Sequence, residues 1–443
     1  MSTIFALSSG ALPSAIAIVR LSGPKSGEVL RVMSRRRNGV LDPRKMFYTR
    51  LHDHDETLID TAMAVYLPGP STFTGEDTAE LFVHGSRAVV NTLARSLSQF
   101  DGVRHAKRGE FSKRAFYNGK MDLAAARGLR DLIHAETDRQ RRVAQKQMDA
   151  GPAVRQLRED LVEAVGRATL LIDFGEHVDC TLDEVKVQSL AILEKLRKMV
   201  SSSRSAEIVH RGLRIVLVGR PNTGKSSLMN RLVQRDVAIV SETAGTTRDS
   251  IEVRLVLNGI PTTLTDTAGL RETDCTVERE GVARAKKRIE EADIALAIFD
   301  ARRPEELAEI IAEIESVDKT LCIVPVANKC DLLEGKTPSS SAQTVQNVPV
   351  PTSAITTDGI DALRAKLERV VEDLCPDESS PSLTEFELLS EALTEVEQSM
   401  ETVDAALCAH HLQNALNIVG ELSGATVTEA ILDRLFAQFC IGK

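Results

Sequence analysis

The stretch Gly219-Arg-Pro-Asn-Thr-Gly224-Lys225-Ser226 decides the fold of the middle of this chain. It follows an apolar run at residues 213–218, which predicts a buried strand, and it precedes a segment with helical period. A loop of this kind surrounds a phosphate with backbone N–H groups, and the helix N-terminus adds positive potential. Lys225 would reach the β and γ phosphates, and the Ser226 hydroxyl would ligate Mg²⁺. The stretch therefore predicts a nucleotide-binding domain.

Strand and helix patterns alternate around this loop, from about residue 208 to 375. Residues 251–257 and 261–266 flank Asn258-Gly259, a dipeptide preferred in two-residue hairpins. Residues 294–299 and 321–326 are further apolar strands, separated by charged stretches of helical period. Alternation of this kind predicts an α/β sheet.

Two further motifs of this domain concern the phosphates and the metal ion. In Asp266-Thr-Ala-Gly269, the Asp266 carboxylate would hold Mg²⁺ through water, and the Gly269 N–H would face the γ phosphate. Thr247, within Gly245-Thr-Thr-Arg-Asp249, is the natural second hydroxyl on Mg²⁺. These elements predict a site that binds a nucleoside triphosphate with its metal.

The motif Asn328-Lys-Cys-Asp331 selects the base. The two carboxylate oxygens of Asp331 match the N1–H and the exocyclic amine of guanine, whereas adenine presents the wrong edge. Ser353-Ala354, after the next strand, would contact the same base. The domain is therefore expected to bind and hydrolyse GTP.

Leu270 stands where many GTPases carry a glutamine that orients the attacking water. A leucine side chain has no polar atom for that task. Asn222, in the phosphate loop, offers a neutral oxygen suited to a monovalent cation, which could stabilise developing charge as an arginine finger does. The sequence thus favours K⁺-assisted hydrolysis.

The flanking segments differ from this domain. Residues 1–118 carry short apolar runs closed by Gly and Pro, at 15–21 and 62–67, and predict a compact α+β module. Residues 119–207 and 376–443 have helical period and are expected to pack together as one discontinuous helical domain. The apolar stripes are Leu157, Leu161, Ala164, Val165, Ala168 and Leu171, then Leu389, Leu393, Val396, Met400 and Val403, then Leu412, Leu416 and Val419.

Composition sets the class of protein. The 443 residues are 42% apolar and 27% charged, which is typical of globular chains. No secretory signal and no span long enough for a bilayer is expected, and seven scattered cysteines suit the cytoplasm. The net charge is −9, but residues 104–146 hold 12 Lys and Arg against 5 Asp and Glu. That basic region either attracts a phosphate backbone or an acidic partner, or is a solvated helix face.

Several motifs together resemble the MnmE (TrmE) family of tRNA-modification GTPases. They include Gly-x-Pro-Asn in the phosphate loop, Ala244-Gly-Thr-Thr-Arg-Asp, Asp266-Thr-Ala-Gly-Leu-Arg-Glu272 and Cys440-Ile-Gly-Lys443. The N-terminal module agrees at Arg20-Leu-Ser-Gly-Pro24, Thr74-Gly-Glu-Asp77, Gly109-Glu-Phe111 and Asn118-Gly-Lys120. The resemblance spans the chain and implies a multidomain α+β and α/β protein. It would comprise a folate-binding-like α+β domain (1–118), a discontinuous helical domain (119–207 and 376–443) and an inserted Ras-like P-loop GTPase domain (208–375).

The resemblance also implies the site residues. The GTP-binding set is Asn222, Thr223, Gly224, Lys225, Ser226, Ser227, Ser241, Glu242, Thr243, Ala244, Gly245, Thr246, Thr247, Asp266, Thr267, Ala268, Gly269, Asn328, Lys329, Asp331, Ser353, Ala354 and Ile355. Mg²⁺ would be bound by Ser226 and Thr247, and K⁺ by Asn222 with the carbonyls of Ser241, Thr243 and Thr246. A tetrahydrofolate derivative would be held by Arg20, Glu80, Lys120 and Lys443. Glu278 would act on the nucleophile through water, and Cys440 would serve the modification reaction, either covalently or by shaping the pocket.

The implied partners are a second copy of the chain, tRNA, and the flavoprotein MnmG, whose FAD would enter only through that partner in a heterotetramer. Together they would modify the 5-position of the wobble uridine.

The chain departs from the family pattern at Arg108, where Pro is usual, and at Ile355, where Lys is usual. An alternative function is a GTP-dependent switch in ribosome assembly or scaffolding. Cys408 with His410 and His411 could suggest a metal, but no fourth ligand lies near in sequence.

Overall fold

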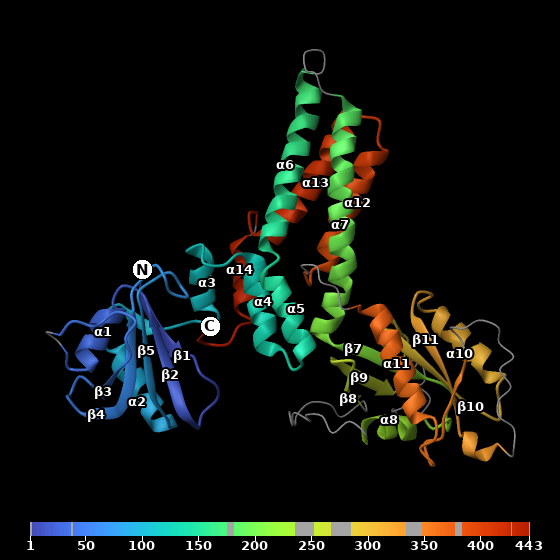
Figure 1. The fold of residues 1–443 in the computed structure, drawn as a ribbon, viewed down its shortest axis with the longest axis horizontal. Helices are drawn as coiled ribbons and strands as arrows, with labels where there is room; N and C mark the ends of the chain where they lie inside the picture. Colours follow the sequence, from blue (N-terminus) through green and yellow to red (C-terminus); the bar gives the residue numbers. More distant parts are fainter. Residues whose placement is uncertain are drawn as a thin grey trace, which may run out of the picture. The chain divides into compact units, whose positions relative to one another are not determined.

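The computed structural model describes residues 2–36, 39–174, 181–234, 252–266, 285–333, 348–376, 383–426 and 428–442 (Figure 1). Two compact units account for these residues. Unit 1 takes in residues 1–133, 147–197 and 387–443, and unit 2 takes in residues 134–146 and 198–386. Each unit is built on a six-stranded sheet.

The sheet of unit 1 has the strand order β3-β4-β5-β2-β1-β6. All neighbours are antiparallel except β1 and β6. Helices α1 and α2 pack on one face, over alternating residues such as Ala17, Val19 and Leu21 of β2, which are buried. The strands are β1 Thr3–Leu7, β2 Ser14–Ser22, β3 Phe47–His52, β4 Leu58–Leu67, β5 Thr78–Gly85 and β6 Val103–His105, and the helices are α1 Ser26–Met33 and α2 Arg87–Ser98.

The opposite face of this sheet carries an apolar row across four strands. Tyr48 pairs with Met63, Met63 with Phe82, and Phe82 with Ile18, so the four side chains lie side by side on β3, β4, β5 and β2. Tyr48 is 67% exposed and Met63 36% exposed, and Ile16, two residues before Ile18, is 61% exposed. An apolar row of this kind on an open sheet is typical of a surface that another protein surface covers.

Helices form the rest of unit 1. Helix α13 packs along α6, and the buried residues Leu157, Leu161, Leu412 and Val419 lie in this bundle, as the helical periods predicted. Val403 is different: α12 ends at Glu401, so Val403 lies beyond the helix and is 90% exposed. The helices are α3 Glu110–Tyr117, α4 Leu123–His134, α6 Gly151–Phe174, α12 Phe386–Glu401, α13 Ala405–Ser423 and α14 Glu429–Phe436, with α5 Asp138–Met148 and α7 Leu182–Arg211 each running from one unit into the other.

The sheet of unit 2 has the order β12-β11-β10-β7-β9-β8 and is parallel except for the β8–β9 pair. Buried apolar clusters lie on both of its faces, which explains why the central strands read as continuous apolar runs. The strands are β7 Leu213–Val218, β8 Glu252–Leu257, β9 Ile260–Asp266, β10 Ile294–Asp300, β11 Cys322–Asn328 and β12 Val350–Pro351, with helices α8 Lys225–Gln234, α10 Glu306–Glu315 and α11 Ile360–Leu374 and the 3₁₀ turn Cys330–Leu332.

The β8–β9 hairpin is the predicted one. Its turn residues Asn258 and Gly259 both have positive φ, +48° and +74°, as a type I′ turn requires. Arg139 of α5 is buried beside it and donates from Nη1 to the Asn258 carbonyl and from Nη2 to the Cys375 carbonyl. Helix α5 is therefore bound to both the hairpin and the end of α11.

The architecture is thus the expected multidomain combination of α+β and α/β parts. Within the described ranges, no helix combines the length and apolar character that crossing a bilayer requires.

Candidate functional site

The phosphate loop leaves β7 at Val218 and enters α8 at Lys225. Two of its glycines cannot be replaced by larger residues. A Cβ at Gly219 would lie 2.1 Å from the Ile298 carbonyl oxygen, and one at Gly224, where φ is +89°, would lie 2.4 Å from Asn328 Nδ2. The loop is therefore held close to the ends of β10 and β11, which leaves its backbone free to surround a small anion.

Lys225 lies inside this loop and is 4% exposed. Its Nζ donates to the carbonyls of Gly219 at 2.8 Å and Arg220 at 2.9 Å. Burial lowers the pKa of the ammonium group, and the Asp266 carboxylate opposes that change. The ammonium is therefore placed where a phosphate would supply stronger, charged acceptors.

Ser226 and Asp266 face one another across the site. The Ser226 Oγ donates to Asp266 Oδ2 at 2.7 Å, and Asp266, the last residue of β9, is fully buried. A hydroxyl and a carboxylate at this separation are oxygen donors of the kind that Mg²⁺ prefers, with phosphate oxygens and water completing its shell. Among the described residues, no group of three or more His, Cys, Asp and Glu side chains gathers where it could hold a metal ion.

The base-binding motif lies at the ends of β11 and β12. Asn328 Nδ2 donates to the Thr223 carbonyl at 2.8 Å, which ties this motif to the phosphate loop. Ser353 is fully buried, and its Oγ donates to Asp331 Oδ1 at 2.6 Å. That bond orients the exposed Asp331 carboxylate, while Ile355 is 74% exposed. The geometry suits recognition of a guanine edge by one fixed carboxylate.

In unit 1, Arg20 and Glu80 are register partners on β2 and β5. Arg20 Nε donates to Glu80 Oε1 at 2.8 Å, and the guanidinium lies 5.7 Å from the centre of the Phe73 ring. Arg20 Nη1 is buried and has no hydrogen-bond partner among the described residues. Lys120 borders the same loop, because a Cβ at Gly75 would lie 3.1 Å from Lys120 Cε. The structure therefore brings Arg20, Glu80 and Lys120 around residues 73–75.

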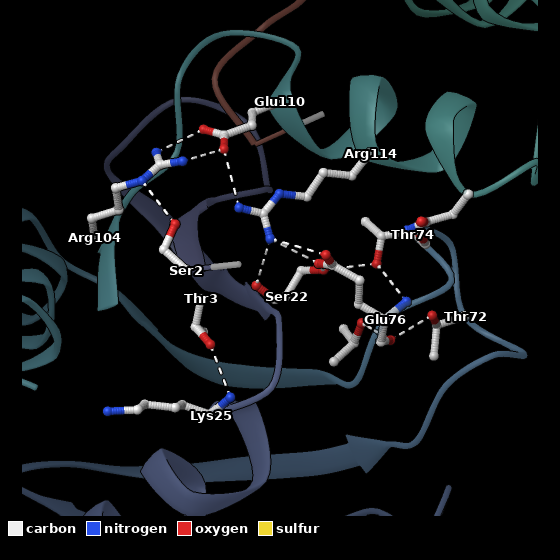
Figure 2. A network of polar contacts seen from close by, with 12 residues as sticks. Ser2, Thr3, Ser22, Lys25, Thr72, Thr74, Glu76, Arg104, Glu110 and Arg114 are labelled. Atoms are coloured by element: carbon white, nitrogen blue, oxygen red, sulfur yellow. Dashed lines mark hydrogen bonds and ion pairs between the residues drawn. The ribbon is translucent and has the colours of Figure 1, made fainter. Parts of the chain in front are cut away.

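A polar network adjoins this group (Figure 2). Arg114 of α3 lies between two carboxylates: Nη1 donates to Glu76 Oε2 at 2.9 Å, and Nη2 donates to Glu110 Oε1 at 3.2 Å. Glu76 also accepts from Ser22 Oγ at 2.7 Å, and Glu110 accepts from Arg104. Residues of three separate sequence motifs thus meet in one hydrogen-bonded cluster that fixes the 73–76 loop against α3.

The C-terminal segment lies against the first strand of the same unit. Cys440 is exposed, and the Gly442 carbonyl accepts from Ser8 Oγ at 3.0 Å. A Cβ at Gly442 would lie 2.1 Å from the Leu7 carbonyl oxygen, so the chain is closely packed at this point. The glycine is needed for close approach and for its φ of +104°.

Comparison with known families agrees with this arrangement. Residues 3–120 match the family described as "GTP-binding protein TrmE N-terminus", and residues 123–440 match that described as "MnmE helical domain". The chain belongs to the MnmE (TrmE) family.

Curated MnmE-family relatives are similar over their full length. The tRNA modification GTPase MnmE of Bartonella quintana (strain Toulouse) is 41% identical over 461 residues, covering 100% of both chains. The protein of the same name from Paramagnetospirillum magneticum (strain ATCC 700264 / AMB-1) is 41% identical over 449 residues, covering 100% of this chain and 99% of the relative. That from Bradyrhizobium sp. (strain ORS 278) is 40% identical over 453 residues, with the same coverage.

Part of the expected MnmE-type site lies outside the described residues. This part comprises Ser241, Glu242, Thr243, Ala244, Gly245, Thr246, Thr247, Thr267, Ala268, Gly269, Glu278 and Lys443. Of the described GTP-binding set, Asn222 is exposed with φ +63°, Ser227 on α8 is exposed, and the Ala354 carbonyl accepts from Arg231 Nε at 2.9 Å.

The sequence analysis of this MnmE-family chain did not single out Asp300, which lies beside the predicted base motif. Asp300, at the end of β10, accepts from Lys329 Nζ at 3.2 Å and from Arg302 at 2.7 Å. Hydrogen bonds from Arg302 hold the pKa of this carboxyl well below its usual range. Its position offered a signal, because Asp266 and Asn328 also end parallel strands at the same edge of the sheet.

Proposed function

We propose that this protein is a GTP-hydrolysing component of tRNA wobble-uridine modification. The observation that carries the proposal is the Asp331–Ser353 pair, joined through Asn328 to a phosphate loop in a chain similar over its full length to tRNA modification GTPases. The proposed domains are residues 1–118, 119–207 with 376–443, and the GTPase domain 208–375. The proposed location is the cytoplasm.

GTP hydrolysis would use the described residues in distinct ways. Lys225 would exchange its two carbonyl contacts for phosphate oxygens, and Asp331 would select guanine. Ser226 and Asp266 fit Mg²⁺ because a hydroxyl and a buried carboxylate already face one another there. When bound, this ion would neutralise charge on the β and γ phosphates.

The proposed K⁺ site includes Asn222 together with the carbonyls of Ser241, Thr243 and Thr246. Asn222 supports it as an exposed residue of the phosphate loop that carries a neutral oxygen acceptor. Thr247 is proposed as a second hydroxyl on Mg²⁺, and Glu278 as the residue that orients the nucleophile through water. These roles account for hydrolysis in a chain whose residue 270 is leucine.

A tetrahydrofolate derivative is proposed to bind beside Arg20, Glu80, Lys120 and Lys443. The buried Nη1 of Arg20, which has no hydrogen-bond partner in the described ranges, supports this, because an acceptor on a ligand would satisfy it. Glu80 could accept from a pterin amine, and Phe73 offers an aromatic face nearby. Cys440 would act near this pocket in the modification reaction.

The proposed assembly is a homodimer formed through the open sheet face of unit 1, which would cover Tyr48, Met63 and Ile16. An MnmG-type flavoprotein would join it in a heterotetramer and supply FAD, and tRNA would be the substrate. Phosphate contacts are proposed for the exposed cations of residues 104–146; Arg139 is buried, and Lys113 and Arg114 already bind carboxylates.

Mass spectrometry of tRNA nucleosides tests the proposal. A strain lacking the gene should lose 5-substituted wobble uridine, and the wild-type gene should restore it. A Ser226→Ala gene should not restore it, because phosphate and Mg²⁺ binding would be impaired. Unaltered tRNA together with accumulating ribosomal precursors would instead support the ribosome-assembly function.

A further inference from the structure

The last helix, α14, is bound firmly to α3 within unit 1. Lys113 Nζ donates to Glu429 Oε1 and to Asp433 Oδ1, both at 2.6 Å. At the start of α3, a Cβ on Gly109 would lie 2.2 Å from the Phe436 carbonyl oxygen. The chain therefore leaves α14 from a fixed point.

Beyond α14, two main-chain carbonyls are held by side chains that lie far away in sequence. Arg108 Nε donates to the Phe439 carbonyl at 3.1 Å, and Ser8 Oγ donates to the Gly442 carbonyl at 3.0 Å. Phe439 is 1% exposed and packs with Phe436 in the apolar cluster formed by α4 and α14. Only Cys440 and Ile441 lie between the two held carbonyls, and both are exposed.

This arrangement presents a thiol from a short segment bound at both ends. A free terminal segment would spread Cys440 over many positions, and each reaction would require it to be ordered again. A segment held on both sides of Cys440 keeps the thiol near the end of β1, whose Ala6 pairs with Arg20 on β2. The two side-chain donors therefore hold the chain on both sides of Cys440, within two residues of the point where Gly442 packs against Leu7 and Ser8.

We propose that Arg108 and Ser8 are positioning residues that hold the C-terminal segment so that Cys440 stays at the modification site. This inference rests on the proposed role of Cys440 in tRNA modification. The two residues act through the main chain, so their loss should affect Cys440 placement and tRNA modification while GTP hydrolysis continues.

The experiment uses the full chain carrying a trifluoromethyl label on its cysteines, read by ¹⁹F NMR. The Cys440 signal is assigned by its loss in Cys440→Ser. In Arg108→Met/Ser8→Ala this signal should narrow about threefold, because the segment gains fast motion. Wobble modification in a strain carrying the unlabelled double variant should fall about tenfold, since the thiol is no longer held in position.

Three controls separate placement from other effects. Lys107→Met removes one exposed cation next to Arg108. The Lys107 side chain makes no hydrogen bond or ion pair within the described residues, so the line width of the Cys440 signal should match wild type. Ser8→Ala alone should narrow the Cys440 signal. Ser8→Thr keeps the hydroxyl, so its line width should match that of the wild type. GTP hydrolysis should stay within about twofold of wild type, which also shows that the variants fold.

An unchanged line width in the double variant would overturn the proposal, whatever the tRNA contains. A narrowed line with normal wobble modification would overturn the positioning role. If a strain carrying the wild-type gene showed no wobble modification, the result would count against the proposed function. The line width would still report whether Arg108 and Ser8 hold the segment around Cys440.

Discussion

The hydroxyl of Ser226 donates to the buried carboxylate of Asp266 at 2.7 Å, joining the first turn of α8 to the end of β9.

Ser226→Ala should weaken GTP binding more than GDP binding, because Ser226 would help to hold a Mg²⁺ ion that offsets the additional negative charge of the γ phosphate. We expect hydrolysis to fall on the order of 10²-fold. Titration with fluorescent GTP and GDP analogues, with and without EDTA, measures this. Equal losses for both nucleotides would show that Ser226 supports the loop and has no part in metal binding.

Asp331→Asn should change base preference. The amide replaces one acceptor oxygen with a donor, which suits the C2 carbonyl of xanthine and opposes the exocyclic amine of guanine. GDP affinity should fall about 10²-fold or more, and XDP affinity should rise. Competition between the two nucleotides on the variant checks it, with Asp358→Asn as a control beyond the base motif. Retained preference for GDP would remove Asp331 from base recognition.

Hydrolysis should be faster in K⁺ than in Na⁺, because residue 270 is leucine and Asn222 offers a cation ligand. Asn222→Ala should abolish the difference while GDP binding stays nearly unchanged. Turnover in matched chloride buffers of equal ionic strength measures both. Equal rates for the wild-type protein in the two salts would exclude the cation from catalysis.

Met63→Arg should convert the proposed homodimer to a monomer, since Met63 lies in the middle of the exposed apolar row that includes Tyr48 and Phe82. A buried, unpaired arginine at each copy of the interface would strongly oppose association. Analytical ultracentrifugation at micromolar concentration tests it. Val403→Arg adds the same charge at a 90% exposed site on the helical part and should leave the dimer intact.

Glu110 should stabilise unit 1 most above pH 4.5. Burial alone would raise its pKa, but hydrogen bonds from Arg104 and from the Lys107 backbone N–H lower it to about 2 from its ordinary value of 4.5. The folded pKa lies below the unfolded one, so the stabilisation is present above pH 4.5 and is lost as pH falls towards 2. Glu110→Gln should cost about 1 kcal/mol at neutral pH after allowance for solvent screening.

Urea midpoints of wild type and Glu110→Gln at several pH values measure this difference. The difference in urea midpoint between the two proteins should become smaller below about pH 4.5, where the carboxyl group of the unfolded chain becomes protonated. A difference that stays constant with pH would mean that Glu110 stabilises the unit by packing alone.

Local patterns predicted much of the fold. Strand β7 coincides with its predicted range because a strand covered on both faces reads as a continuous apolar run. The hairpin followed from Asn258-Gly259, since few other dipeptides adopt positive φ at both positions. The described residues of the expected nucleotide site lie near one another because several of their motifs end strands of one sheet.

Contacts between distant residues could not be predicted in this way. Nothing near Ser8 in sequence indicates a bond to Gly442, and the strand-end position of Asp300 does not reveal that Lys329 donates to it. Helix α5 is polar along most of its length, so burial of Arg139 depends on carbonyl acceptors that only the folded chain brings together. Val403 continued an apolar period that the end of α12 interrupts.

Arg139 also determines how the GTPase domain can be dissected. A fragment excised at residue 208 would lose α5 and most of α7, leaving the carbonyls of Asn258 and Cys375 without their guanidinium donor. It would also uncover the part of the apolar cluster that Val143 contacts. Isolating a stable, autonomous GTPase fragment therefore requires residues 134–146 to be supplied alongside it, in cis through a linker or in trans as a peptide.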